Sequence, residues 1–301
     1  MKKASPSRKT AAKTLYETFK VLKENGGELR AKEVIAALGN RLEFTEWELE
    51  RYEKTNNIRW QSILHFYTID AIKAGYLRKN KGTWILTDDG EKAMSQGADL
   101  LLDNAKKAYQ EWKKEQDGQE EGENEEVEDL GDKEKLHEAR LQELDEESTE
   151  GLRDFIIKKN PYEFQEMTAA LLRAMGYYTP HIASRGKDGG VDIVAYEDPL
   201  GAKGTRIKVQ VKHQPDSAVS VDEVRKLIGV MTKDADVGLF VTSGRFAGTC
   251  QEFSRNSHKH VELIDFERFV SLWQDYYGKF TDEDKAHMPL KPIFFLGDYE
   301  I

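Results

Sequence analysis

Three polar residues lie where two neighbouring strands are predicted, and together they suit the hydrolysis of a phosphodiester. Asp192 begins the strand-like run VDIVAYE, and Gln210 and Lys212 lie two residues apart on the next run, RIKVQVKH. Because side chains alternate along a strand, Gln210 and Lys212 leave the same face, whereas the valines beside them leave the other. Polar groups that face together from adjacent strands are costly in a core, and they persist where they bind a metal or do chemistry.

The same residues offer the oxygen ligands that a hard divalent cation prefers. The Asp192 carboxylate, a side-chain oxygen of Gln210 and the backbone carbonyl of Val211 are predicted to hold Mg²⁺, or another divalent cation such as Mn²⁺. Lys212 then stands beside a metal-bound water, where its ammonium orients that water and stabilises the charge developing on an attacked phosphate. The alternative interpretation makes Asp192 a strand cap and places Gln210 and Lys212 on an exposed edge strand.

Five segments, taken in order, resemble the Mrr-type restriction endonucleases of the PD-(D/E)XK nuclease superfamily. They are FQEMTAALLRAMGY, GKDGGVD, VQVKH, GLFVTSGRF and VELID, and the resemblance covers about residues 152–275. It implies an α/β fold with a restriction-endonuclease-like mixed-sheet core, and a catalytic role for Asp192, Gln210 and Lys212. It also implies a metal-dependent nuclease that restricts foreign or methylated DNA. The first hundred residues are similar to the N-terminal winged-helix domain of that family.

Further residues near the predicted site are candidates for accessory roles. Members of the family often have Glu directly after the phenylalanine of the helix PYEFQEMTAALLRAM, where this chain has Gln165. Glu163 and Gln165 flank the apolar stripe of that helix, within reach of the site. Asp188 lies among glycines, where a turn-forming role competes with an accessory one. The same glycine-rich turn is expected to let a DNA backbone approach, and its basic residues are candidate DNA contacts: Arg185 and Lys187.

Helical periodicity near the N-terminus predicts helices over about 11–23, 31–38 and 58–74, followed by a basic hairpin within 76–90. This order is typical of a winged helix, whose recognition helix fits the major groove while its hairpin lies against phosphates. The candidate DNA-binding residues are those with polar or basic side chains on the third helix and the hairpin: Arg59, Gln61, His65, Arg78, Lys79 and Lys81. The competing interpretation is a winged helix used for protein contacts.

One segment makes the chain acidic. The net charge is −10, but residues 113–151 hold 17 acidic and 5 basic side chains, so the remainder sums to +2. Dense like charge with few apolar residues predicts a solvated linker, with a short helix from about 132 to 144. The functional alternative is an acidic decoy that competes with DNA for a basic groove. We therefore expect a winged-helix DNA-binding domain at 1–112, an acidic linker at 113–151, and a nuclease domain with a C-terminal tail at 152–301.

The composition excludes several classes of protein. With a single cysteine, Cys250, and no apolar run approaching the length of a membrane span, the chain is neither a disulfide scaffold nor a transmembrane protein, so no membrane partner is expected. Its basic N-terminus lacks the apolar stretch of a signal peptide, which predicts a cytoplasmic location. The leading hypothesis is a metal-dependent endonuclease that cuts double-stranded DNA as a homodimer or higher homo-oligomer. The alternatives are a catalytically weak DNA-binding or regulatory module, and a structure-specific repair or junction nuclease of the same fold.

Overall fold

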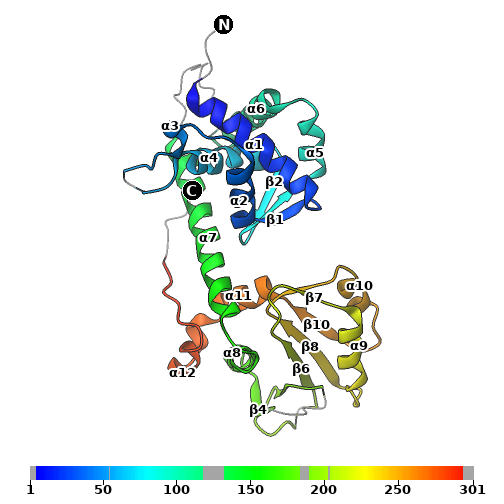
Figure 1. The fold of residues 1–301 in the computed structure, drawn as a ribbon. Helices are drawn as coiled ribbons and strands as arrows, with labels where there is room; N and C mark the ends of the chain where they lie inside the picture. The colour runs from blue at the N-terminus through cyan, green and yellow to red at the C-terminus, as the bar shows by residue number, and fades with distance from the viewer. Residues whose placement is uncertain (1–4, 54, 118–131, 184–189, 203, 294–301) are drawn as a thin grey trace. The chain divides into compact units, whose positions relative to one another are not determined.

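The chain divides into two units in the computed structural model, Met1–Gly151 and Leu152–Ile301 (Figure 1). The structure describes residues 5–53, 55–117, 132–183, 190–202 and 204–293. Each unit has a buried hydrophobic core of its own. Within these described ranges, no helix has both the length and the apolar character needed to cross a membrane.

The first unit packs helices around a small antiparallel sheet. In chain order its elements are α1 (Pro6–Glu24), β1 (Glu28–Arg30), α2 (Ala31–Arg41), α3 (Glu46–Leu49), α4 (Arg59–Lys73), β2 (Leu77–Asn80), β3 (Thr83–Leu86), α5 (Asp88–Met94), α6 (Ala98–Asp117) and most of α7 (Lys133–Ile157), whose residues 152–157 belong to the second unit. Strand β3 lies between β1 and β2 and pairs antiparallel with both. The core contains Phe19 of α1, Trp60 of α4 and Trp84 of β3. A helical N-terminal unit that carries a hairpin is therefore confirmed.

The segment predicted to be a solvated linker differs from that expectation in its second half. Residues 118–131 lie outside the described part of the chain. The helix expected from about 132 to 144 is confirmed, but it is longer than expected, because α7 spans residues 133–157. Lys135 and Glu146 of this helix are buried in the first unit, where Lys135 pairs with Asp70 of α4 and Glu146 with Lys79 of β2. The composition of residues 133–151 predicts exposure to solvent. The oppositely charged residues that pair with Lys135 and Glu146 lie far away in the sequence, and these pairs allow α7 to be buried.

The second unit is built on a five-stranded mixed sheet with the strand order β10-β8-β6-β5-β4. Its elements are α8 (Pro161–Ala174), β4 (Tyr178–Ile182), β5 (Ile193–Tyr196), β6 (Arg206–Lys212), β7 (Ala218–Val219), α9 (Val221–Gly229), β8 (Asp236–Thr242), β9 (Arg245–Phe246), α10 (Thr249–Arg255), β10 (Val261–Ile264), α11 (Phe266–Asp275), the 3-10 turn η1 (Tyr277–Lys279) and α12 (Asp282–Lys285). Strands β10, β8 and β6 run parallel, whereas β5 and β4 are antiparallel to their neighbours. The predicted mixed-sheet α/β fold is confirmed.

Two apolar clusters lie on opposite faces of this sheet. On one face Val209 of β6 packs with residues of α8 and α11, including Phe164 and Trp273. On the other face Phe240 of β8 packs with residues of α9 and with Cys250, whose buried thiol donates to the carbonyl of Val219. Because side chains alternate along β6, its even-numbered positions leave on the α9 face.

Candidate active site

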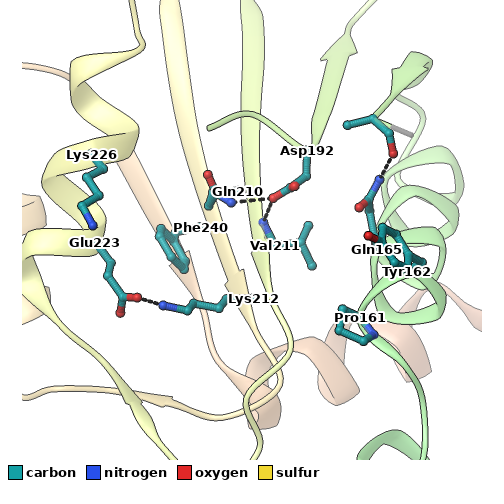
Figure 2. A pocket seen from close by; sticks show the side chains of 11 residues that line it. Pro161, Tyr162, Gln165, Asp192, Gln210, Val211, Lys212, Glu223, Lys226 and Phe240 are labelled. Atoms are coloured by element: carbon teal, nitrogen blue, oxygen red, sulfur yellow. Dashed lines mark hydrogen bonds and ion pairs between the residues drawn. The ribbon is translucent and has the colours of Figure 1, made fainter. Parts of the chain in front are cut away.

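Asp192 lies immediately before β5 and is fixed by the strand beside it. Its backbone N–H donates to the carbonyl of Val209 at 2.8 Å. Its carboxylate is 7% exposed, and Oδ2 accepts hydrogen bonds from the Gln210 amide at 2.7 Å and the Val211 backbone N–H at 2.6 Å (Figure 2). Two donors from β6 therefore hold the Asp192 carboxylate against the strand that carries Lys212.

Lys212 is the last residue of β6, and its side chain points toward helix α9. There it meets a carboxylate that no motif in the sequence indicates. Its Nζ forms an ion pair with Glu223 (Figure 2). Glu223 is itself fixed, since its other oxygen accepts from the backbone N–H of Ser220 at 3.0 Å in a capping box at the start of α9. Burial and the positive charge of Lys226 lower the pKa of Lys212. The only sequence signal for Glu223 is its place three residues after Ser220, and that spacing reports helix capping rather than a site.

The ion pair gives Glu223 a testable role as a positioning residue. We expect Glu223→Gln to slow the reaction at this site about tenfold or more, because Lys212 loses the group that orients it. A carboxylate stabilises the protonated lysine, so its removal lowers the Lys212 pKa further, and the alkaline limb of the rate–pH profile should move to lower pH. Asp222→Asn provides a charge-matched control on the same helix, because Asp222 is exposed and pairs with Arg225. An unchanged pH profile in Glu223→Gln would contradict the role.

These side chains line one open cavity of about 420 Å³ in the second unit. Its walls come from the start of α8, strands β6 and β8, helix α9 and the residues around Asp192: Pro161, Tyr162, Gln165, Ala183, Asp192, Gln210, Val211, Lys212, Glu223, Lys226 and Phe240. The structure thus brings the predicted Asp192, Gln210 and Lys212 to a common, solvent-accessible place.

Of the two accessory candidates on α8, only Gln165 reaches the cavity. Its amide N–H donates to the carbonyl of Ala183 at 2.8 Å, which holds the side chain in the cavity wall. Glu163 instead caps the helix, because its carboxylate accepts from the backbone N–H of Asn160 at 2.8 Å. Its accessory role is therefore not supported by its position. Three further candidates, Arg185, Lys187 and Asp188, lie outside the described residues.

The donor set suits a cation that needs few protein ligands. Asp192 supplies a carboxylate and Val211 a backbone carbonyl oxygen beside it. The Gln210 amide donates its N–H to Asp192 in this structure, and a flip of the amide plane would present its oxygen instead. This set matches the preference of Mg²⁺ for one or two carboxylates and retained waters. The described residues contain no group of three or more His, Cys, Asp or Glu side chains placed to hold a metal. A cage made wholly of protein ligands, of the kind that Ca²⁺ or Zn²⁺ takes, is therefore not present in that part of the chain.

The predicted DNA contacts of the first unit differ in their exposure. Arg78 is exposed, and Gln61 and Lys81 are half-buried. Arg59 stacks on the ring of Trp47, 4.6 Å from its centroid, and donates to the Glu50 carboxylate at 2.7 Å, so its guanidinium already has partners.

The side chains of His65 and Lys79 are buried in this structure, so their groove-facing and phosphate-facing positions stay predictions. Burial lowers the pKa of His65 well below its usual value and also lowers that of Lys79. Helix α7 contributes to this burial: its Glu146 carboxylate lies 3.1 Å from the Lys79 ammonium, and the negative charge partly opposes the lowering of the Lys79 pKa.

Comparison with known proteins connects both units to one family. A model described as restriction endonuclease, Mrr_cat, matches residues 156–273, and the Mrr N-terminal domain matches residues 12–96. Among solved structures, the MspJI restriction endonuclease in complex with a 27-mer oligonucleotide shares 22% identity over 48% of this chain and 35% of its own, with a TM-score of 0.36. The DNA modification-dependent restriction endonuclease AspBHI shares 21% identity over 46% of this chain and 38% of its own, with a TM-score of 0.37.

The chain spans little more than a third of those two solved chains. No curated protein matches its sequence. The two family models, by contrast, fall on separate units, with the N-terminal model in the first and the endonuclease model in the second. The chain therefore contains an Mrr N-terminal domain in its first unit and an Mrr-type restriction endonuclease domain in its second.

Proposed function

We propose that the chain is a metal-dependent DNA endonuclease that hydrolyses phosphodiester bonds in foreign, modified DNA. The observation that carries this proposal is the meeting of Asp192, Gln210 and Lys212 in one open cavity. Two of these side chains are joined by a hydrogen bond of 2.7 Å, and the third is oriented by Glu223. A carboxylate, an amide oxygen and an ammonium at the end of a central strand suit catalysis at a phosphate.

Asp192, Gln210 and the Val211 carbonyl are the groups that would hold Mg²⁺. When bound, the metal lowers the pKa of a water and screens the negative charge of the phosphate. The Val211 N–H keeps the Asp192 carboxylate facing the cavity. Lys212 supplies a positive charge that stabilises the extra charge on the attacked phosphate, and Glu223 keeps that ammonium in place.

The first unit is proposed to be a winged-helix domain that captures double-stranded DNA, with α4 as its recognition helix and the β2–β3 hairpin as its wing. The domain boundaries that go with this proposal are 1–112, 113–151 and 152–301. Cutting both strands needs two active sites, so the active form is proposed to be a homodimer or higher homo-oligomer in the cytoplasm. Methylated bases are the proposed mark of the foreign DNA.

The direct test is cleavage of one plasmid prepared from a methylating and from a non-methylating host, with Mg²⁺ or with a chelator. We expect cleavage only with the metal, and faster cleavage of the methylated plasmid by about tenfold or more. Linear and nicked products separated on a gel give the rates.

The other outcomes assign the alternatives. Equal cutting of both plasmids, with preference for branched substrates, would replace modification dependence with a structure-specific repair or junction nuclease. DNA binding that survives the chelator, without cleavage of any substrate, would identify a DNA-binding or regulatory module.

A further inference from the structure

Helix α7 lies against the first unit through a stripe of side chains that contains no large apolar residue. The buried residues of its first five turns are Lys135, Ala139, Glu146 and Thr149, which are between 4% and 8% exposed. Their spacing of four, seven and three residues places them on one face of the helix. Leu136, by contrast, is 45% exposed. Ion pairs and hydrogen bonds therefore hold α7 together with one small apolar contact, that of Ala139 with Ile69 and Tyr109.

The buried charges of α7 engage the hairpin and the helix that are proposed to contact DNA. The Glu146 carboxylate accepts a hydrogen bond from the Trp84 indole at 2.7 Å, lies 3.1 Å from the Lys79 ammonium and stands 3.9 Å from the His65 ring. Lys79 in turn lies over the Trp84 ring, 4.2 Å from its centroid. One carboxylate thus occupies the junction of the recognition helix and the wing, where a basic side chain would otherwise meet a phosphate.

Two more carboxylates of α7, those of Glu143 and Glu138, contact residues at the two ends of α4. Glu143 accepts from the side-chain amide of Asn57 at 2.8 Å, just before α4 begins. Glu138 lies 3.7 Å from the Lys73 ammonium, at the end of α4. Carboxylates of α7 therefore stand at both ends of α4, where phosphates of a DNA strand could stand, whereas between them Lys135 of α7 pairs with the buried Asp70 of α4.

The turn between β2 and β3 is covered as well. A Cβ placed on Gly82, in the middle of that turn, would lie 3.6 Å from the Cβ of Thr149. Glu150, one residue further on, lies 3.9 Å from the Arg30 guanidinium. Gly82, at the tip of the proposed wing, is therefore covered by α7, whereas Lys81 beside it is half-buried.

We propose that α7 is a built-in competitor of DNA, whose carboxylates occupy the DNA-binding face of the first unit until the helix is displaced. The proposal rests on the proposed function, in which this unit captures duplex DNA. A polyanion can take the place of the α7 carboxylates at Lys79 and Lys73, so these two cations would exchange one anionic partner for another. The contact is also incomplete, since the side-chain oxygen of Gln142 is buried without a hydrogen-bond partner within the described part of the chain.

Replacing carboxylates of α7 by neutral side chains should expose the proposed DNA-binding face of the first unit. We expect the full chain carrying Glu143→Gln and Glu146→Gln to bind a duplex of about 20 base pairs about tenfold or more tightly than the wild type, because a larger fraction is competent to bind. Fluorescence anisotropy in the presence of a chelator measures binding without cleavage. The matched control is Asp145→Asn with Glu147→Gln, which changes the net charge equally on exposed positions of the same helix. Equal tightening by both pairs would overturn the proposal, because bulk charge alone would then explain the effect.

Locking α7 in place should have the opposite effect. The Cβ separation of 3.6 Å at Gly82 and Thr149 suits a disulfide in the variant Gly82→Cys with Thr149→Cys, and the native Cys250 is buried away from it. We expect the oxidised protein to bind the duplex at least about tenfold more weakly than the same protein after reduction. The reduced form carries both substitutions and so controls for any strain at Gly82.

The two experiments also separate this inference from the function on which it rests. Equal binding by the oxidised and reduced proteins, with the disulfide verified by mass spectrometry, would overturn masking by α7 while leaving the nuclease proposal intact. Failure of the wild type and of every variant to bind or cut DNA would overturn the proposed function itself.

Discussion

Lys212→Ala is expected to reduce DNA cleavage by about 100- to 1,000-fold, the usual cost of losing one group that stabilises charge in the transition state. The Lys212 ammonium lies in the same cavity as Asp192 and is held there by Glu223. Its removal leaves the Glu223 carboxylate unpaired in the cavity, which adds repulsion toward a phosphate. The measurement is the single-turnover rate of plasmid nicking in Mg²⁺ at enzyme concentrations that saturate the DNA.

Lys226→Ala is the matched comparison, because Lys226 lines the same cavity and carries the same charge. It is expected to lower DNA affinity through one lost electrostatic contact and to reduce the saturated rate by less than about tenfold. The Lys212 side chain is 37% exposed, so its truncation should leave the thermal unfolding of the second unit unchanged. Equal nicking by wild type and Lys212→Ala would remove the proposed mechanism.

Gly244→Ala is expected to destabilise the second unit by about 2–4 kcal/mol. Gly244 follows β8 at a point where another segment crosses closely: a Cβ there would lie 2.3 Å from the carbonyl oxygen of Gln214 and 2.6 Å from that of Ser217. Both obstacles are backbone atoms, so relief requires movement of the chain. The same bend supports the end of β6, because the Ser243 N–H donates to the Lys212 carbonyl at 3.2 Å. We therefore expect slower cleavage as well as a lower unfolding temperature.

Gly248→Ala is the control for this prediction. No atom lies within 4 Å of a Cβ built on Gly248, and its φ of −54° is one that alanine adopts readily. Its effect on stability should be neutral, or a gain of about 0.4–1 kcal/mol from a less flexible unfolded chain. Calorimetry of the full chain distinguishes the two variants, and equal transition temperatures would contradict the close approach at Gly244.

Local patterns in the sequence predict the nuclease fold well, because each pattern reports its own element. The alternating run RIKVQVKH becomes the central strand β6, and the amphipathic stretch after Asn160 becomes α8. The long helix α7 is predicted poorly. Its charge density indicates solvation, but Lys135 and Glu146 are buried by partners that lie 65 and 62 positions away in the sequence, Asp70 and Trp84. Contacts between residues so far apart in the sequence leave no local sequence pattern from which burial could be predicted.

The candidate site likewise contains residues that the sequence predicts and a residue that it does not. Asp192, Gln210 and Lys212 could be named from strand alternation and from the family resemblance, and the structure brings them into one cavity. Glu223 could not be named, because its contact with Lys212 depends on how α9 packs against the sheet. Residue type makes Lys79 and His65 candidate DNA contacts. Their burial depends on contacts with α7, so the sequences of the hairpin and of helix α4 do not predict it.

The ion pairs of α7 also affect how the affinity for DNA would depend on ionic strength. A protein that neutralises phosphates normally releases one set of condensed cations, so its DNA affinity falls steeply as salt is added. Here each incoming phosphate would replace a carboxylate that leaves Lys79 or Lys73, and the freed carboxylates would take up cations from solution. Fewer ions are then released in total, and the logarithm of DNA affinity should fall with the logarithm of salt concentration along a shallower line than the phosphate contacts alone would give.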